Sequence, residues 1–136
     1  MNPSGTPPSL DIALRELFAS TGPLARALPG YRVRSEQIEM SLAILQAMAE
    51  GRSVVVEAGT GVGKTAAYLV PAMLAGGKVI VSTGTKALQD QLFHRDLPNV
   101  RDALGLPIKA ALLIGATSSA TPVPWLGSTR IGRSVR

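Results

Sequence analysis

The sequence predicts an α/β fold in which helices flank a parallel sheet. Three β-branched residues, Val54–Val56, form an apolar run that leads into a glycine-rich turn. A helix-forming run opens at Lys64 and stops at Gly76-Gly77, and a second β-branched run, Val79–Val81, follows it. Strand, turn, helix and strand in this order predict a right-handed βαβ unit, whose strands are parallel.

Composition sets the broad class of the protein. The 136 residues suffice for one domain with a usable core, and a composition that is 46% hydrophobic and 17% charged argues against disorder. A net charge of +5 and a pI near 10.2 favour polyanionic partners such as nucleic acid, with plain solubility as the alternative.

Localisation is inferred from three features of the chain. No apolar run is long enough to cross a membrane, so we expect no membrane partner. Cysteine is absent, which excludes disulfides and cysteine-ligated metal within this chain. Residues 1–8 have no basic start followed by an apolar stretch, so we expect no secretory signal and a cytoplasmic location.

Apolar residues at helical spacing predict four further helices, over residues 9–20, 24–28, 35–50 and 86–94. Ser9 and Ser35 are the expected N-caps of the first and third of these. The inward positions are expected to be Ile38, Leu42, Leu45 and Met48 in one helix, and Leu88 and Leu92 in another. Residues 98–107 are expected to form a loop with a short helix, and residues 108–113 a third strand.

The glycine-rich turn predicts a phosphate-binding loop, formed by Ala58, Gly59, Thr60, Gly61, Val62, Gly63, Lys64 and Thr65. Glycines let the backbone bend sharply and point successive N–H groups at phosphate oxygens, and the helix after the loop adds the positive end of its dipole. Lys64 would meet the β- and γ-phosphates, and the Thr65 hydroxyl would bind Mg²⁺. The alternative is a chance glycine-rich turn, which the flanking strand and helix disfavour.

Two other segments carry candidate binding residues. Ser82, Thr83 and Thr85 form a hydroxyl-rich turn at the end of a predicted strand, where they could hold a nucleic-acid phosphate; capping of the next helix by Thr85 is the alternative. Gln37, near the start of a predicted helix, is either an exposed polar residue or a base-reading one. The single histidine, His94, has no metal-ligand companions nearby and is expected on the surface.

Three motifs in this order resemble the start of a DinG/XPD-type superfamily 2 DNA helicase. They are Gln37, the loop Glu57–Thr65 with its A-x-x-G-x-G-K-T spacing, and Val81–Thr85 with Leu88–Leu92, and the resemblance covers about residues 30–114. It implies a truncated RecA-like P-loop NTPase domain that binds ATP and Mg²⁺, with Lys64 and Thr65 in the catalytic site. It also implies that Gln37 recognises adenine.

The same resemblance assigns DNA-backbone contacts to the third motif, through Ser82, Thr83, Thr85 and Gln89. Gly84 departs from the family, which places a larger residue there, and this puts one contact in doubt. Members of the family are ATP-driven 5′ to 3′ helicases, usually with a four-cysteine iron–sulfur cluster. The implied partner is single-stranded or forked DNA, and the implied state is a monomer.

The sequence departs from a complete helicase in two respects. It contains no Asp-Glu pair to hold Mg²⁺ and orient water, and no second RecA-like domain, so we expect very slow hydrolysis by this chain alone. We divide it into a lead with a short helix (1–30), a partial ATP-binding domain (31–114) and an irregular basic tail (115–136). One hypothesis is that the tail is translated out of frame; the alternative is a divergent C-terminus.

Two other functions remain open at this point. One is a small P-loop phosphotransferase, for which the sequence offers Arg130 and Arg133 but no folded lid. The other is a non-enzymatic module that binds ATP or nucleic acid without turnover. Salt-sensitive binding to single-stranded DNA would disfavour the first, and DNA-stimulated ATPase activity would disfavour the second.

Overall fold

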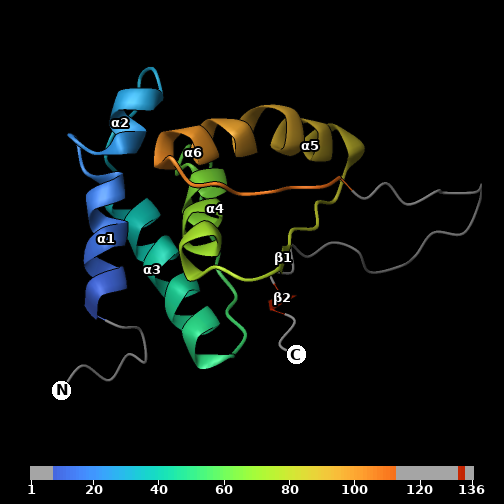
Figure 1. Cartoon of the computed structure of the whole chain (residues 1–136), viewed down its shortest axis with the longest axis horizontal. Helices are drawn as coiled ribbons and strands as arrows, with labels where there is room; N and C mark the ends of the chain where they lie inside the picture. Colours follow the sequence, from blue (N-terminus) through green and yellow to red (C-terminus); the bar gives the residue numbers. More distant parts are fainter. Residues whose placement is uncertain (1–7, 113–131, 134–136) are drawn as a thin grey trace, which may run out of the picture.

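The computed structural model describes residues 8–112 and 132–133, and these residues are largely helical. The elements in chain order are α1 (Pro8–Phe18), α2 (Pro23–Ala27), α3 (Ser35–Glu50), α4 (Lys64–Ala75), β1 (Val79–Ile80), α5 (Lys86–Gln91), the π-helical turn η1 (Leu92–Asp96), α6 (Leu97–Leu104) and β2 (Gly132–Arg133). Figure 1 shows α1, α3 and α4 side by side, while the continuous stretch from α5 to α6 runs over one end of α4, with α6 beside α2.

The hydrophobic core lies where these two groups of helices meet. Leu14 and Phe18, one turn apart on α1, are both fully buried, and side chains from every larger helix join them. The other buried members of the cluster are Leu24, Leu45, Leu69, Val70, Leu92 and Val100. Within the described part of the chain, no helix combines the length and the apolar character that a membrane span requires.

Most predicted helices are confirmed, and two predicted caps are wrong. The structure confirms helix α3 at Ser35–Glu50 and the end of α4 before Gly76-Gly77. However, Arg34 occupies the N-cap position of α3, and the Ser35 hydroxyl donates to a carboxylate oxygen of Glu36 at 3.2 Å. Helix α1 begins at Pro8, which suits a first helical turn, so Ser9 lies inside the helix.

The helix predicted at 86–94 extends much further. It passes through η1 into α6 and ends at Leu104, and Pro98 lies in the first turn of α6, where its missing N–H costs little. Leu92 is buried as expected, whereas Leu88 is 52% exposed, so its predicted inward position is wrong. Leu88 lies in α5, a short helix with no buried residue, so helical spacing from Leu92 does not place it in the core.

The described residues do not form the predicted parallel sheet. Val54, Val55 and Val56 are irregular, and Val55 is 97% exposed. β1 does form at Val79–Ile80, but it pairs antiparallel with β2 (Gly132–Arg133). Residues 108–112 form no strand, and residue 113 lies outside the described part. Strand-forming side chains need neighbouring strands to pair with, and the predicted neighbours do not pair here.

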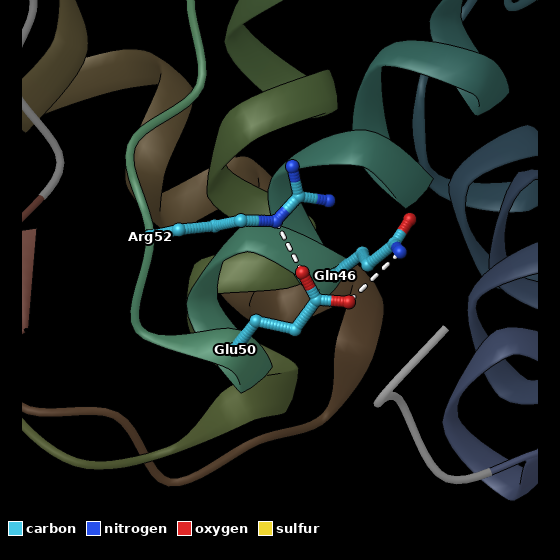
Figure 2. A network of polar contacts seen from close by, with 3 residues as sticks. All are labelled: Gln46, Glu50 and Arg52. Atoms are coloured by element: carbon cyan, nitrogen blue, oxygen red, sulfur yellow. Dashed lines mark hydrogen bonds and ion pairs between the residues drawn. The ribbon is translucent and has the colours of Figure 1, made fainter. Parts of the chain in front are cut away.

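A polar network marks the end of α3, where the chain turns toward the glycine-rich loop (Figure 2). Glu50 accepts hydrogen bonds from the Gln46 side chain at 2.9 Å and from the Arg52 guanidinium. Gly51 adopts the left-handed conformation (φ 65°), and the Arg52 N–H bonds back to the Ala47 carbonyl at 3.0 Å. The helix therefore ends at a defined residue and directs residues 52–59 away from its axis.

Candidate functional site

Two glycines of the predicted phosphate-binding loop adopt a backbone conformation that favours glycine. Gly61 (φ 80°) and Gly63 (φ 78°) both occupy the left-handed region, which glycine enters without a Cβ penalty. Helix α4 begins at Lys64, directly after Gly63, and no side chain caps its first turn. The free N–H groups of that turn can therefore meet an anion.

The side chain of Gln37 is buried beside the loop and bonded to it. Its side chain is 4% exposed, and Nε2 donates to the Gly63 carbonyl at 2.9 Å. A carbonyl only accepts, so this contact fixes which end of the amide faces the loop. Oε1 is then buried with no hydrogen-bond partner among the described residues. The interpretation of Gln37 as an exposed helix residue is wrong, and an unpaired buried acceptor calls for a donor.

The same contact explains why residue 63 is a glycine. A Cβ at this position would collide with Gln37 Nε2, and the left-handed φ would strain any L-residue in addition. Gly63 O also accepts from Ala67 N at 3.2 Å, so one carbonyl joins the loop, α3 and α4.

Sequence reasoning missed Ser41, one turn beyond Gln37 on α3. Ser41 is fully buried, and its hydroxyl donates to the Ala67 carbonyl at 2.7 Å. The signal was Pro71 inside the α4 sequence, because proline leaves the carbonyl one turn earlier without its helical donor. The sequence does not show, however, which helix would provide the replacement.

Lys64 and Thr65 begin α4 and differ in burial. Lys64 is exposed, and its side-chain ammonium has no hydrogen-bond or ion-pair partner in the described part of the chain. Thr65 is half-buried beside Tyr68. Burial raises the pKa of Tyr68, the Thr65 hydroxyl lowers it, and the Asp96 carboxylate raises it again. The net direction is upward, so the phenol stays protonated near neutral pH.

The hydroxyl-rich turn between β1 and α5 is partly occupied by its own hydrogen bonds. Thr85 caps α5, since its Oγ1 accepts from the Leu88 N–H at 3.2 Å, and Thr83 Oγ1 donates to the Thr85 carbonyl at 3.3 Å. The capping alternative is therefore confirmed, although a capping hydroxyl keeps its own proton to donate. Ser82 and Gln89 are half-buried. A Cβ at Gly84 would meet no atom within 4 Å, so packing does not require glycine there.

A cavity of about 120 Å³ joins the two candidate regions. Thr65 and Tyr68 line it from α4, Thr83 and Gly84 from the turn after β1, and Asp96 from η1. The structure thus brings the predicted Mg²⁺ ligand close to the predicted nucleic-acid turn. Across the described residues, no three His, Cys, Asp or Glu side chains gather as a metal site, and His94 is exposed.

Comparison with known proteins agrees with this geometry. A family model described as DEAD/DEAH box helicase matches residues 37–126, a range that begins at Gln37 and includes the loop and the hydroxyl-rich turn. The chain belongs to this helicase family. The resemblance to DinG-type helicases is confirmed by relatives of that name, and membership implies a RecA-like P-loop fold with ATP and Mg²⁺ as ligands.

The helicase relatives are much longer than this chain. It is 54% identical over 101 residues to the ATP-dependent DNA helicase YoaA of Escherichia coli (strain K12), a match that covers 74% of this chain and 16% of that protein. It is 45% identical over 100 residues to the ATP-dependent helicase DinG of Mycobacterium tuberculosis (strain ATCC 25618 / H37Rv), covering 71% and 14%. It is 40% identical over 96 residues to the 3'-5' exonuclease DinG of Bacillus subtilis (strain 168), covering 68% and 10%. No solved structure matches the chain.

The residues present fit ATP and Mg²⁺ but not an iron–sulfur cluster. An uncapped helix start, two left-handed glycines and an exposed lysine supply the donors and the charge that nucleotide phosphates need. The chain contains no cysteine, so it offers no thiolate to an iron–sulfur cluster.

Proposed function

We propose that this chain carries the ATP-binding segment of an ATP-dependent DNA helicase. The observation that supports this most strongly is the hydrogen bond from Gln37 Nε2 to the Gly63 carbonyl. The contact joins a buried amide to the residue directly before Lys64, so the side chain proposed to read the base would touch the loop proposed to bind the phosphates. Buried polar atoms in proteins are normally paired, so a buried amide with an unpaired oxygen is not expected beside a glycine-rich turn that binds nothing.

Each part of the nucleotide would meet a different part of the site. The phosphates would lie against the backbone N–H groups of residues 58–63 and the start of α4, with Lys64 supplying a full positive charge. The Thr65 hydroxyl would bind Mg²⁺, and the unpaired Gln37 Oε1 would accept a hydrogen bond from the adenine amino group. Bound Mg²⁺ would neutralise phosphate charge together with Lys64.

DNA would bind at the hydroxyl-rich turn, through Ser82, Thr83, Thr85 and Gln89. Backbone contacts of this kind position a strand without reading its sequence, and the net charge of +5 favours a polyanion. We propose single-stranded or forked DNA as the partner, a cytoplasmic location and, for a helicase that carries this segment, a monomeric state. Because the cavity joins Thr65 to Thr83, nucleotide and DNA would act on neighbouring groups.

The parallel sheet belongs to this proposal as well. Residues 54–56 and 79–81 are apolar and β-branched, and residues 108–112 are apolar apart from Lys109, yet only 79–80 form a strand here. In a chain as long as the helicase relatives, further strands would pair with these segments and cover their exposed valines.

Slow turnover is part of the same proposal. The sequence has no Asp-Glu pair, so Mg²⁺ would rest on Thr65, phosphate and water without a carboxylate to orient the attacking water. A module that binds ATP or nucleic acid without hydrolysing ATP is therefore the second candidate function.

The test is MgATP binding by the 136-residue chain, measured by calorimetry, with Lys64→Ala as the variant. Lys109→Ala is the matched control, because Lys109 is also exposed but lies in a different segment. We expect Lys64→Ala to weaken binding by about a hundredfold, the worth of a charge-assisted contact, and Lys109→Ala to leave it unchanged. Equal affinities in all three proteins would reject the proposed site. Turnover with and without single-stranded DNA then separates the enzyme from the binding module.

A further inference from the structure

Two buried residues on neighbouring helices, Ser41 of α3 and Pro71 of α4, are linked through one carbonyl. Proline has no N–H, so the carbonyl one turn before Pro71, that of Ala67, lacks its donor within α4. The Ser41 hydroxyl donates to this same carbonyl at 2.7 Å, and both Ser41 and Pro71 are fully buried. The serine therefore supplies the hydrogen bond that the proline removes.

The position of Ala67 gives this replacement a consequence beyond packing. Helix α4 runs from Lys64 to Ala75, so Ala67 completes its first turn, and Lys64 and Thr65 open that turn. Because Pro71 interrupts the hydrogen-bond ladder just beyond, the first turn is held less firmly by the rest of its own helix. Helix α3 holds it instead, through Gln37 on Gly63 and Ser41 on Ala67.

We propose that Ser41 is a positioning residue of the nucleotide site, whose hydroxyl replaces the hydrogen bond lost at Pro71 and so fixes the first turn of α4. This inference rests on the proposed ATP site and deepens it. Ser41 lies under α4 rather than in the loop, so it acts on the ligand through the placement of Lys64 and Thr65. Its effect falls on the phosphates, because those two residues face phosphate and metal and not the base.

The first test compares ligands that differ in phosphates. In Ser41→Ala the buried Ala67 carbonyl loses the donor that replaces the missing N–H of Pro71, and we expect MgATP to bind about tenfold more weakly. AMP, which lacks the β- and γ-phosphates, should bind Ser41→Ala within about twofold of the unaltered chain. Calorimetry well below the unfolding midpoint gives both affinities.

The second test restores the missing donor. Pro71→Ala returns an N–H to α4, which can then satisfy the Ala67 carbonyl without Ser41. The loss caused by Ser41→Ala should shrink to about twofold when it is measured in the Pro71→Ala background. Amide hydrogen exchange at Ala67, Tyr68 and Leu69 should follow the same pattern without any ligand: faster in Ser41→Ala, and restored in the double variant.

The outcomes separate this inference from the ATP site itself. Equal weakening of MgATP and AMP, or no rescue by Pro71→Ala, would show a general packing role and overturn the inference while the ATP site stands. Unchanged amide exchange in Ser41→Ala would overturn it as well. If the unaltered chain binds MgATP no better than Lys64→Ala does, the proposed function fails, and the positioning role falls with it, even where the exchange data confirm the Ser41 bond.

Discussion

Gln37 donates a 2.9 Å hydrogen bond from Nε2 to the main-chain carbonyl of Gly63, and its other amide atom, Oε1, stays buried without a partner among the described residues. The two atoms therefore have different tasks. Nε2 connects helix α3 to the loop. Oε1, as a buried acceptor without a partner, costs stability unless a ligand donates a hydrogen bond to it. In the proposed nucleotide site, Gln37 would link recognition of the base to the position of the loop.

Replacing Gln37 should alter both affinity and base preference. In Gln37→Ala the unpaired acceptor is removed together with the bond to Gly63, so we expect ATP to bind about tenfold more weakly and the preference for ATP over GTP to disappear. Gln46→Ala is the matched control, because Gln46 lies on the same helix but its side chain bonds to Glu50 rather than to the loop. Calorimetric titration with both nucleotides gives the ratio. A Gln37→Ala protein that weakens ATP and GTP equally would reduce Gln37 to a loop-positioning residue.

Gly63→Ala should abolish nucleotide binding. The added Cβ would collide with Gln37 Nε2, and alanine at φ 78° also bears a left-handed penalty of about 1 kcal/mol or more. Gly105→Ala is the control: Gly105 ends α6 with φ 64°, but a Cβ there meets nothing within 4 Å. Both variants should lose stability in urea unfolding, and only Gly63→Ala should lose MgATP. Retained binding in Gly63→Ala would show that Gln37 can move aside at little cost.

Helices were predictable because their signals are local. Residues 35–50 carry apolar side chains at helical spacing and a glycine directly after them, and the structure has α3 with these bounds. The start of α4 at Lys64 follows in the same way from the glycines before it. The loop and its helix could therefore be located from the sequence alone.

Features that depend on distant residues were not predictable in this way. Val54–Val56 has the composition of a strand, but whether it forms one depends on neighbours elsewhere in the chain, and here it stays irregular. The burial of Gln37 and the role of Ser41 depend on how α3 lies against α4, which no local pattern specifies. The antiparallel pairing of β1 with β2 joins segments far apart in sequence.

The stability of the chain should fall at alkaline pH because of its tyrosines. Burial raises the pKa of Tyr68 above the ordinary 10.0, and burial does the same for Tyr31, whose hydroxyl donates to the Phe18 carbonyl at 2.9 Å. A raised folded-state pKa gives stability that is complete below pH 10.0 and is lost as the pH rises through the folded value.

Urea unfolding between about pH 9 and pH 11 measures this loss. We expect the free energy of unfolding to decrease across this range and the decrease to be smaller in Tyr68→Phe. Tyr31→Phe should also flatten the curve, but with lower stability at neutral pH, since it removes a hydrogen bond worth about 1 kcal/mol. A Tyr68→Phe curve parallel to that of the unaltered chain would show that Tyr68 titrates normally.

The exposed valines before the loop should make the isolated chain prone to self-association. Val55 is 97% exposed between two other valines, and residues 52–59 form no strand, so apolar side chains and backbone groups are both available to another chain. Val55→Lys places a charge at the centre of this segment without disturbing the buried core. It should therefore reduce association while leaving the free energy of unfolding within about 0.5 kcal/mol.

Val33→Lys is the matched control, because Val33 is also exposed, at 46%, but precedes α3 and lies outside the valine run. Light scattering or sedimentation over a range of concentrations should show larger species for the unaltered chain and for Val33→Lys, and fewer for Val55→Lys. Equal reduction by both lysines would attribute the effect to net charge, which rises identically in the two variants. A monomer at all concentrations would mean that other residues of the same chain shield the valine run. The isolated chain would then need no further strands to remain monomeric.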